Sequence, residues 1–263
     1  MATDPYAAPR AHLADAALAA SPDGTFTRAG RAVATGRGWS WIAEGWRLFK
    51  RQPGVWIGTV VVAFLLLMLL GLVPFVGNVV GTVLGPVIAA GLMTGCRALD
   101  SGGRMRFADL FAGFQRRFGA LALTGLIYLG ALIAIVVIAA LLAGVGAGTM
   151  LQAWGGGEVE QGMSGARLAL FGLLVMALVL PVAMAIWFVS PLLVFHEELG
   201  PLEAMKASFF GCVKNVLPFL LYGVVGMGLA IVATIPVALG WLLFGPTLAA
   251  SIYTAYRDIF FVP

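Results

Sequence analysis

Cysteine and histidine, which commonly bind metals or act in catalysis, are few in this 263-residue chain, and their spacing suits neither role. Cys96 and Cys212 lie far apart, and the two histidines are His12 and His196. Because these positions match no metal-binding or redox motif, we expect neither a metal nor another cofactor. The His-Glu-Glu run that starts at position 196 lacks zinc-protease spacing and falls where a predicted span ends, which favours a solvated loop.

The composition is that of a membrane protein. Apolar residues make up 61% of the chain and charged residues 11%, against about 25% charged in a typical soluble domain. No Asp, Glu, Lys, Arg or His stands in the middle of any predicted span. Proton-coupled carriers and intramembrane hydrolases normally need such groups, so we expect a protein that is not an enzyme. We also expect no nucleic-acid partner.

Uncharged runs divide the chain into membrane spans. The 45 residues between Arg51 and Arg97 and the 42 residues from Asn215 to Tyr256 contain no Asp, Glu, Lys or Arg. Each run is long enough for two helices of about 20 residues. With the runs between them, they predict an all-α membrane domain over residues 37–263 with six spans, at about 55–73, 79–96, 120–146, 168–195, 216–238 and 241–256.

The positions of the basic residues predict the orientation. Of the 16 Lys and Arg residues, 15 lie in the N-terminal segment, the 97–117 loop, the 196–214 loop or the C-terminal tail. Since cytoplasmic loops are enriched in Lys and Arg, these segments and both termini are predicted to be cytoplasmic. Residues 1–36 carry charges without an apolar stretch, and we expect them to form a disordered cytoplasmic tail.

Three segments with aromatic side chains at helical spacing precede the three pairs of spans. Each is predicted to be an amphipathic helix in the headgroup plane. The apolar faces of the first two segments comprise Trp39, Ile42, Trp46, Phe49, Phe107, Phe111 and Phe114. The pattern predicts three tandem units, each an interfacial helix followed by a helical hairpin.

A small residue followed by proline recurs in the second span of each unit. The pairs are Gly85 with Pro86, Ser190 with Pro191, and Gly245 with Pro246. Proline removes a backbone donor, so we expect a kink at each pair. The freed carbonyls would either border a central polar cavity or be satisfied by serine, threonine or water.

Two runs carry a likeness to a known group of proteins. The run from Gly36 to Gly58 and the run from Ala90 to Asp100, which ends in Gly-Cys-Arg-Ala-Leu-Asp, resemble an uncharacterised family of bacterial six-span inner-membrane proteins. More distantly, the repeated plan is similar to YciC-like proteins and to the membrane domain attached to some glycerophosphodiester phosphodiesterases. The resemblance implies a bacterial inner-membrane location, but no activity, because this chain has no hydrolase domain.

Basic residues gather in the predicted interfacial helices. The candidates for contact with lipid headgroups are Arg47, Lys50, Arg51, Arg104, Arg106, Arg116 and Arg117. A basic residue near an anionic leaflet contributes about 1 kcal/mol to lipid attraction, although charges that only set the topology would show the same pattern. We therefore expect an anionic membrane lipid as a partner.

These observations favour a non-enzymatic protein that engages lipid, either by moving amphipathic molecules or by organising the envelope. An alternative is a structural partner or assembly factor of a membrane complex, which would dock a membrane protein on its interfacial helices. An uncoupled channel through the kinked helices is less favoured. The sequence leaves the oligomeric state open.

Overall fold

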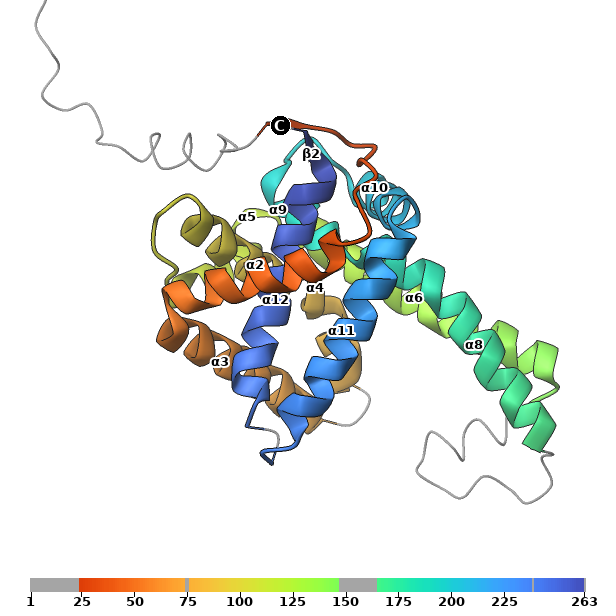
Figure 1. Ribbon diagram of the computed structural model, residues 1–263. Coiled ribbons are helices and arrows are strands. Elements are labelled where there is room, and N and C mark those ends of the chain that lie inside the picture. The colour runs from red at the N-terminus through yellow and green to blue at the C-terminus, as the bar shows by residue number, and fades with distance from the viewer. Residues whose placement is uncertain (1–23, 74–75, 147–164, 238, 263) are drawn as a thin grey trace, which may run out of the picture.

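The computed structural model describes residues 24–73, 76–146, 165–237 and 239–262 (Figure 1). Within these ranges the regular structure is helical except for one pair of two-residue strands, so the all-α class is confirmed. The elements are β1 Thr25–Phe26, α2 Arg37–Arg51, α3 Pro53–Gly71, α4 Val76–Asp100, η1 Phe107–Phe111, α5 Ala112–Arg116, α6 Phe118–Ala143, α8 Gly165–Ile186, α9 Val189–Phe195, α10 Pro201–Val213, α11 Val216–Thr234, α12 Trp241–Phe260 and β2 Phe261–Val262.

Five of the described segments are long and apolar enough to cross a membrane. They are Pro53–Gly71, Val76–Asp100, Phe118–Ala143, Gly165–Phe195 and Val216–Thr234. Each turns much of its apolar surface outward, which is unfavourable in water and expected in lipid. The sixth predicted span lies in α12, which is not among the five; α12 carries several hydroxyl side chains and ends in Arg257, Asp258, Ile259 and Phe260.

The three small-proline pairs have different local structures. Pro86 and Pro246 stand inside the continuous helices α4 and α12. In the fourth span, by contrast, α8 ends at Ile186 and α9 begins at Val189. The break includes Trp187, four positions before Pro191. Proline has no backbone N–H, so the helical hydrogen bond to the Trp187 carbonyl is lost. The predicted span 168–195 is therefore two helices rather than one.

Helix α2 packs closely across α11 and α12 because two of its residues are glycines. Gly38 lies against the backbone of Pro218 and Tyr222, and Gly45 lies against Thr247 and Ser251. Trp41, between them on the same face, is fully buried. Predicted face residues Ile42 and Phe49 are buried as well, whereas Trp39 and Trp46 are exposed. The predicted apolar stripe of α2 is thus divided between the protein core and the surface.

The second predicted interfacial helix is broken. A 3-10 turn (η1) is followed by the short helix α5, and both pack on α4. Gly91 of α4 lies against the Leu110 backbone, and Gly113 of α5 lies against the Val87 carbonyl. These close backbone contacts hold the η1–α5 segment against α4. The segment is therefore held in place by α4 although it is not one continuous helix.

Helices α6 and α8 run side by side and extend away from the rest of the molecule (Figure 1). The pair contacts the body through the first part of α6, where Gly125 lies against Val83 of α4. α10 meets α8 there as well, since the Ser208 hydroxyl donates to the Met184 carbonyl at 2.7 Å. No residue of α8 is fully buried.

The N-terminal segment from residue 24 is ordered and crosses the end of α12, which corrects the predicted disordered tail over residues 24–36. β1 pairs antiparallel with β2, placing Phe26 opposite Phe261. The Asn215 side chain binds the same segment by accepting from the Val33 amide and donating to the Arg31 carbonyl. Residues 1–23 of the predicted tail lie outside the described residues.

We predict that Gly45→Ala lowers the midpoint of thermal unfolding in detergent. A Cβ at this position would lie 2.7 Å from the Thr247 carbonyl oxygen and 2.8 Å from the Ser251 nitrogen. Relieving such an overlap costs about 1–3 kcal/mol. The control is Gly223→Ala in α11, where no atom lies within 4 Å and alanine favours the helix. Equal midpoints for the two variants would contradict the close packing of α2.

Candidate functional site

A buried carboxylate joins the two ends of the chain. Asp258, near the end of α12, has a side chain that is only 8% exposed. Its oxygens accept from Arg31 at 3.0 Å, from the Nε of Arg37 at 2.6 Å and from the indole of Trp41 at 2.9 Å. A buried charge is tolerated when it is paired and hydrogen-bonded, and Asp258 meets both conditions.

Two further carboxylates extend this network along α2 and α4. Glu44 lies 3.3 Å from Arg37 and 3.7 Å from Arg47. Asp100, at the end of α4, pairs with Arg257 and accepts from the Tyr253 hydroxyl at 3.1 Å. Burial opposes the charged form of Arg37, but Asp258 and Glu44 outweigh burial and raise the pKa of its guanidinium.

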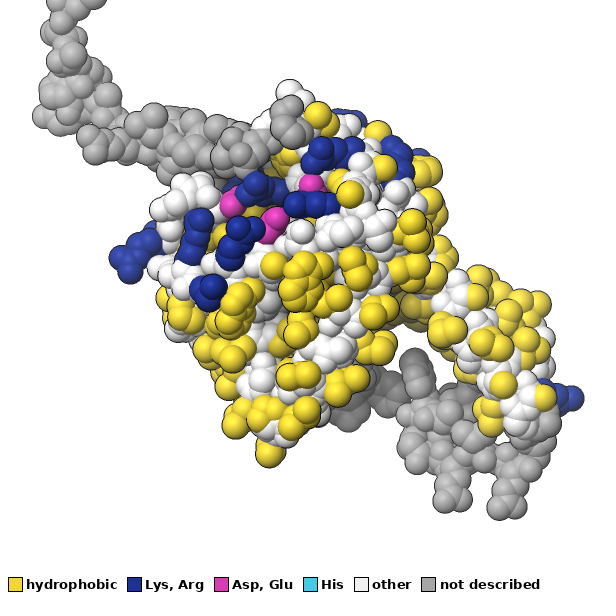
Figure 2. Space-filling view, in the orientation of Figure 1, with side chains coloured by type: hydrophobic (Ala, Val, Ile, Leu, Met, Phe, Trp, Pro, Cys, Tyr) yellow, Lys and Arg dark blue, Asp and Glu magenta, His cyan; other side chains and the backbone are white. Residues whose placement is uncertain are grey.

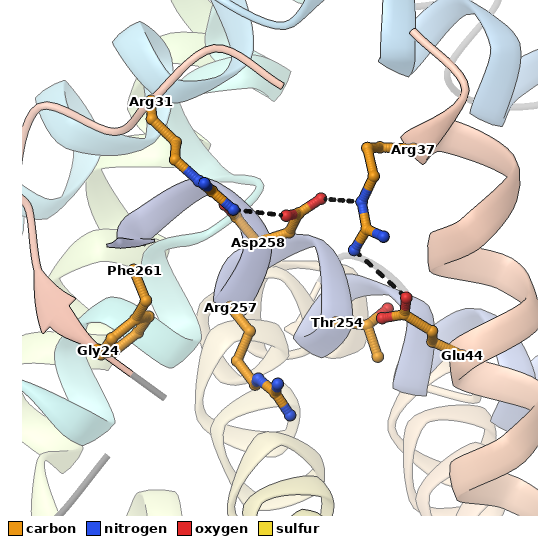
Figure 3. A pocket seen from close by; sticks show the side chains of 8 residues that line it. All are labelled: Gly24, Arg31, Arg37, Glu44, Thr254, Arg257, Asp258 and Phe261. Atoms are coloured by element: carbon orange, nitrogen blue, oxygen red, sulfur yellow. Dashed lines mark hydrogen bonds and ion pairs between the residues drawn. The ribbon is translucent and has the colours of Figure 1, made fainter. Parts of the chain in front are cut away.

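The network surrounds a hollow surface that we call the arginine groove. It consists of two neighbouring hollows of about 360 and 340 Å³, which share Arg37, Glu44, Thr254 and Arg257 as lining residues. Figure 3 shows the first hollow, in which Arg31 and Arg37 approach Asp258 from opposite sides while Arg257 points away from it. The second hollow is completed by Arg47, Leu48, Arg51 and Asp100.

The groove belongs to a charged end of the molecule. Figure 2 shows Lys and Arg side chains gathered there with a few Asp and Glu among them, and apolar side chains covering the surface below. Exposed rings occur in the two segments that carry many of these basic residues, in α2 and in η1 with α5: Trp39, Trp46, Phe107, Phe111 and Phe114. An apolar body bordered by aromatic and basic side chains is the pattern of a membrane–water interface.

The seven predicted headgroup residues do not form one site. Arg47 and Arg51 line the arginine groove. Lys50 instead lies over the Trp46 ring, 6.0 Å from its centroid. Elsewhere, Arg106 lies 3.9 Å from Asp109, and the exposed residues Arg104 and Arg116 do not line either hollow.

Arg117, the seventh predicted headgroup residue, connects two segments of the protein. Its two terminal nitrogens donate to the carbonyls of Glu197 and Leu199, each at 2.6 Å. The side chain therefore ties the start of α6 to the loop between α9 and α10. Its guanidinium is committed to backbone acceptors rather than directed at the surface.

Sequence reasoning missed Arg31, Arg37 and Arg257 as members of the site. Glu44 pairs with Arg37 and Arg47, which lie on the same helix. Adjacent charges at the end of a predicted span, as at positions 257 and 258, are the signal that could have indicated the site. Their partners lie 157 positions earlier in the chain for Arg257 and 221 and 227 positions earlier for Asp258, and they carry no local signal.

The predicted kink residues lie elsewhere. Pro86, Ser190, Pro191 and Pro246 are buried, and neither groove hollow includes them. The Ser190 hydroxyl donates to the Pro86 carbonyl at 3.1 Å, which joins the second span directly to the fourth. Space remains around Gly85 and Gly245: a Cβ would meet no atom within 4 Å at the former and only the Val60 side chain, 3.8 Å away, at the latter.

The sequence predicted that His196 lies in a solvated loop, but the structure buries its side chain. Its side chain is 13% exposed, stacks on Phe26 with ring centroids 3.6 Å apart, and lies 2.7 Å from the Tyr256 hydroxyl. Burial lowers the pKa of His196 to about 4, because neighbouring Glu198 compensates only in part. The N-terminal segment, expected to be disordered, is what covers the ring.

We predict that stability falls with acidification because of His196. Since its folded pKa lies below the ordinary value of 6.5, its contribution is complete above that pH and is lost as the pH falls from 6.5 toward 4. Each pH unit within this window costs up to about 1.4 kcal/mol. Thermal unfolding across the window should show a steeper loss for the native protein than for His196→Gln. Parallel pH profiles would contradict the assignment.

Comparison with known proteins identifies one informative relative. The chain is 30% identical over 205 residues to a "probable inner membrane protein" of Burkholderia thailandensis, in a match that covers 76% of this chain and 75% of the relative. No family model matches the chain, and no solved structure matches it. Together with the apolar helices, this identity shows that the chain belongs to the family of that inner-membrane protein and is itself a multi-pass protein of the inner membrane.

Proposed function

We propose that this protein is a non-enzymatic inner-membrane protein that engages anionic lipid through its charged end. The observation that carries the proposal is the arginine groove, located at the end of an otherwise apolar molecule. Arginine binds phosphate oxygens well because its planar guanidinium presents several donors in a fixed geometry. Exposed rings near the groove, such as Trp39 and Trp46, suit the boundary between headgroups and acyl chains.

The proposal includes six spans with the charged end in the cytoplasm. α12 is 20 residues long, and the Tyr222 hydroxyl of α11 hydrogen-bonds to its Ser251, which supports a hairpin of α11 and α12. Hydroxyl side chains of this kind are tolerated within a membrane when they bond to neighbouring helices. The concentration of Lys and Arg at one end supports a cytoplasmic location for that end.

We further propose that the chain consists of three tandem units. The packing follows one rule: α2 packs on α12, η1 with α5 on α4, and α10 on α8 and α9. Each segment that precedes a hairpin thus contacts the second span of another hairpin. The ring of contacts would hold the charged segments together at one end. The distant similarity to YciC-like proteins and to the phosphodiesterase membrane domain stays a prediction.

The absence of enzyme activity is part of the proposal and rests on the sequence. Apart from Arg51, the described ionisable side chains of the site are engaged with one another at the end of the bundle, and the middle of each proposed span is uncharged. This distribution suits binding of a headgroup better than proton transfer within the membrane.

A second candidate is a scaffold for a membrane complex. The pair α6 and α8 favours it, because the two helices extend from the body and expose apolar side chains such as Leu126 and Met176 on their surface. In a membrane these side chains would contact lipid or another protein. A stoichiometric protein companion after gentle extraction would support this candidate.

We predict that the gently extracted protein retains anionic phospholipid in excess of its share in the host membrane. Native mass spectrometry with identification of the retained lipids measures this directly. Electrostatic attraction is screened by salt, so raising the ionic strength during extraction should reduce the retained fraction. A lipid composition equal to that of the membrane, at any ionic strength, would contradict lipid engagement.

A further inference from the structure

We infer that the arginine groove is a discrete binding site for a phosphate group, carried either by a lipid headgroup or by a soluble phosphate ester. The inference deepens the proposed lipid engagement and depends on it only for the lipid source of the phosphate. It differs from general attraction between a basic surface and a membrane, because it assigns the binding to one set of side chains.

The charges that line the groove do not balance. Among the residues that the structure describes, five arginines and three carboxylates line the two hollows, which gives an excess of two positive charges. Asp258 and Glu44 are each shared by two arginines, and Asp100 pairs with Arg257. A phosphate group carries one or two negative charges and would neutralise this excess.

Arg51 contributes to the excess positive charge of the groove. It has no carboxylate partner among the described residues, and one of its terminal nitrogens donates to the Leu99 carbonyl. That bond fixes the side chain at the edge of the second hollow, and because Arg51 is exposed, its remaining N–H groups face solvent, where water or an anion provides their acceptors. Phosphate oxygens would supply them.

The groove can present donors to a tetrahedral anion from two sides. Arg47 and Arg51 stand one helical turn apart on α2, and Arg257 approaches from α12. Carboxylates hold two of these three guanidinium groups, those of Arg47 and Arg257, in place before a ligand arrives, which reduces the entropy lost on binding. Each hollow, at about 340–360 Å³, is large enough for a phosphate with its attached ester group.

The test compares two variants that remove the same charge from the same end of the molecule. The first is Arg47→Gln with Arg51→Gln in the groove; the control is Arg104→Gln with Arg106→Gln outside it. Binding to the purified full chain is measured for phosphatidic acid in phosphatidylcholine nanodiscs, and separately for inorganic phosphate and glycerol 3-phosphate. Because the groove variant loses charge-assisted hydrogen bonds to the phosphate, we expect it to bind about tenfold more weakly or worse.

The outcomes separate the site from the wider function. Loss of phosphatidic acid binding only in the groove variant supports a site for a lipid phosphate. Loss of glycerol 3-phosphate binding only in that variant, with no lipid bound, supports the site for a soluble ester and overturns lipid engagement. Equal loss in both variants overturns the discrete site but leaves lipid engagement standing. If no phosphate compound binds, the inference is wrong.

A folding control keeps the comparison decisive. The Arg47 side chain is 69% exposed and that of Arg106 is 78% exposed, so neither replacement should affect folding. If the double groove variant has a lower unfolding midpoint, the phosphate affinities of the single variants Arg47→Gln and Arg106→Gln are compared instead. Equal phosphate affinity of these two single variants would then overturn the inference.

Discussion

The arrangement of the charged end depends on a single buried carboxylate. Asp258 is charged, almost fully enclosed, and contacted from three directions by Arg31, Arg37 and Trp41. Removing a charge from water is costly unless partners replace the lost hydration, so these contacts must form together. They fix the N-terminal segment and α2 to the end of α12. The contacts also hold Arg31 and Arg37, which line the first hollow of the arginine groove.

The same connection explains how an apolar molecule can carry an ordered polar surface. α2 approaches α11 and α12 closely through Gly38 and Gly45, and it buries Trp41 between them. The outer side of the helix then presents Arg37, Glu44 and Arg47 to the groove. One short helix thus joins the core of the membrane domain to its charged end. Lipid engagement, as proposed, uses the outer side of that helix.

Much of this organisation could be predicted from the sequence, for physical reasons. Spans are readable because lipid excludes charge, so the uncharged runs after Arg51 and after Lys214 mark helices. The ion pairs could not be predicted, since Arg31 and Asp258 stand 227 positions apart and no periodicity connects them. A kink at Pro191 was expected from the sequence, but not that the span divides into two helices there. The ordered segment at Phe26 was missed because its order depends on distant partners such as His196.

The most direct test of the account is to find where an anionic headgroup lies on the protein in its own membrane. A phosphatidic acid analogue with a photoreactive group in the headgroup would be introduced into membranes that contain the protein, and the labelled peptides would be identified. The account predicts labelling of α2 and of the last turn of α12, with reduced labelling when Arg47 and Arg51 are replaced. Labelling confined to α6 and α8, or unchanged by those replacements, would contradict it.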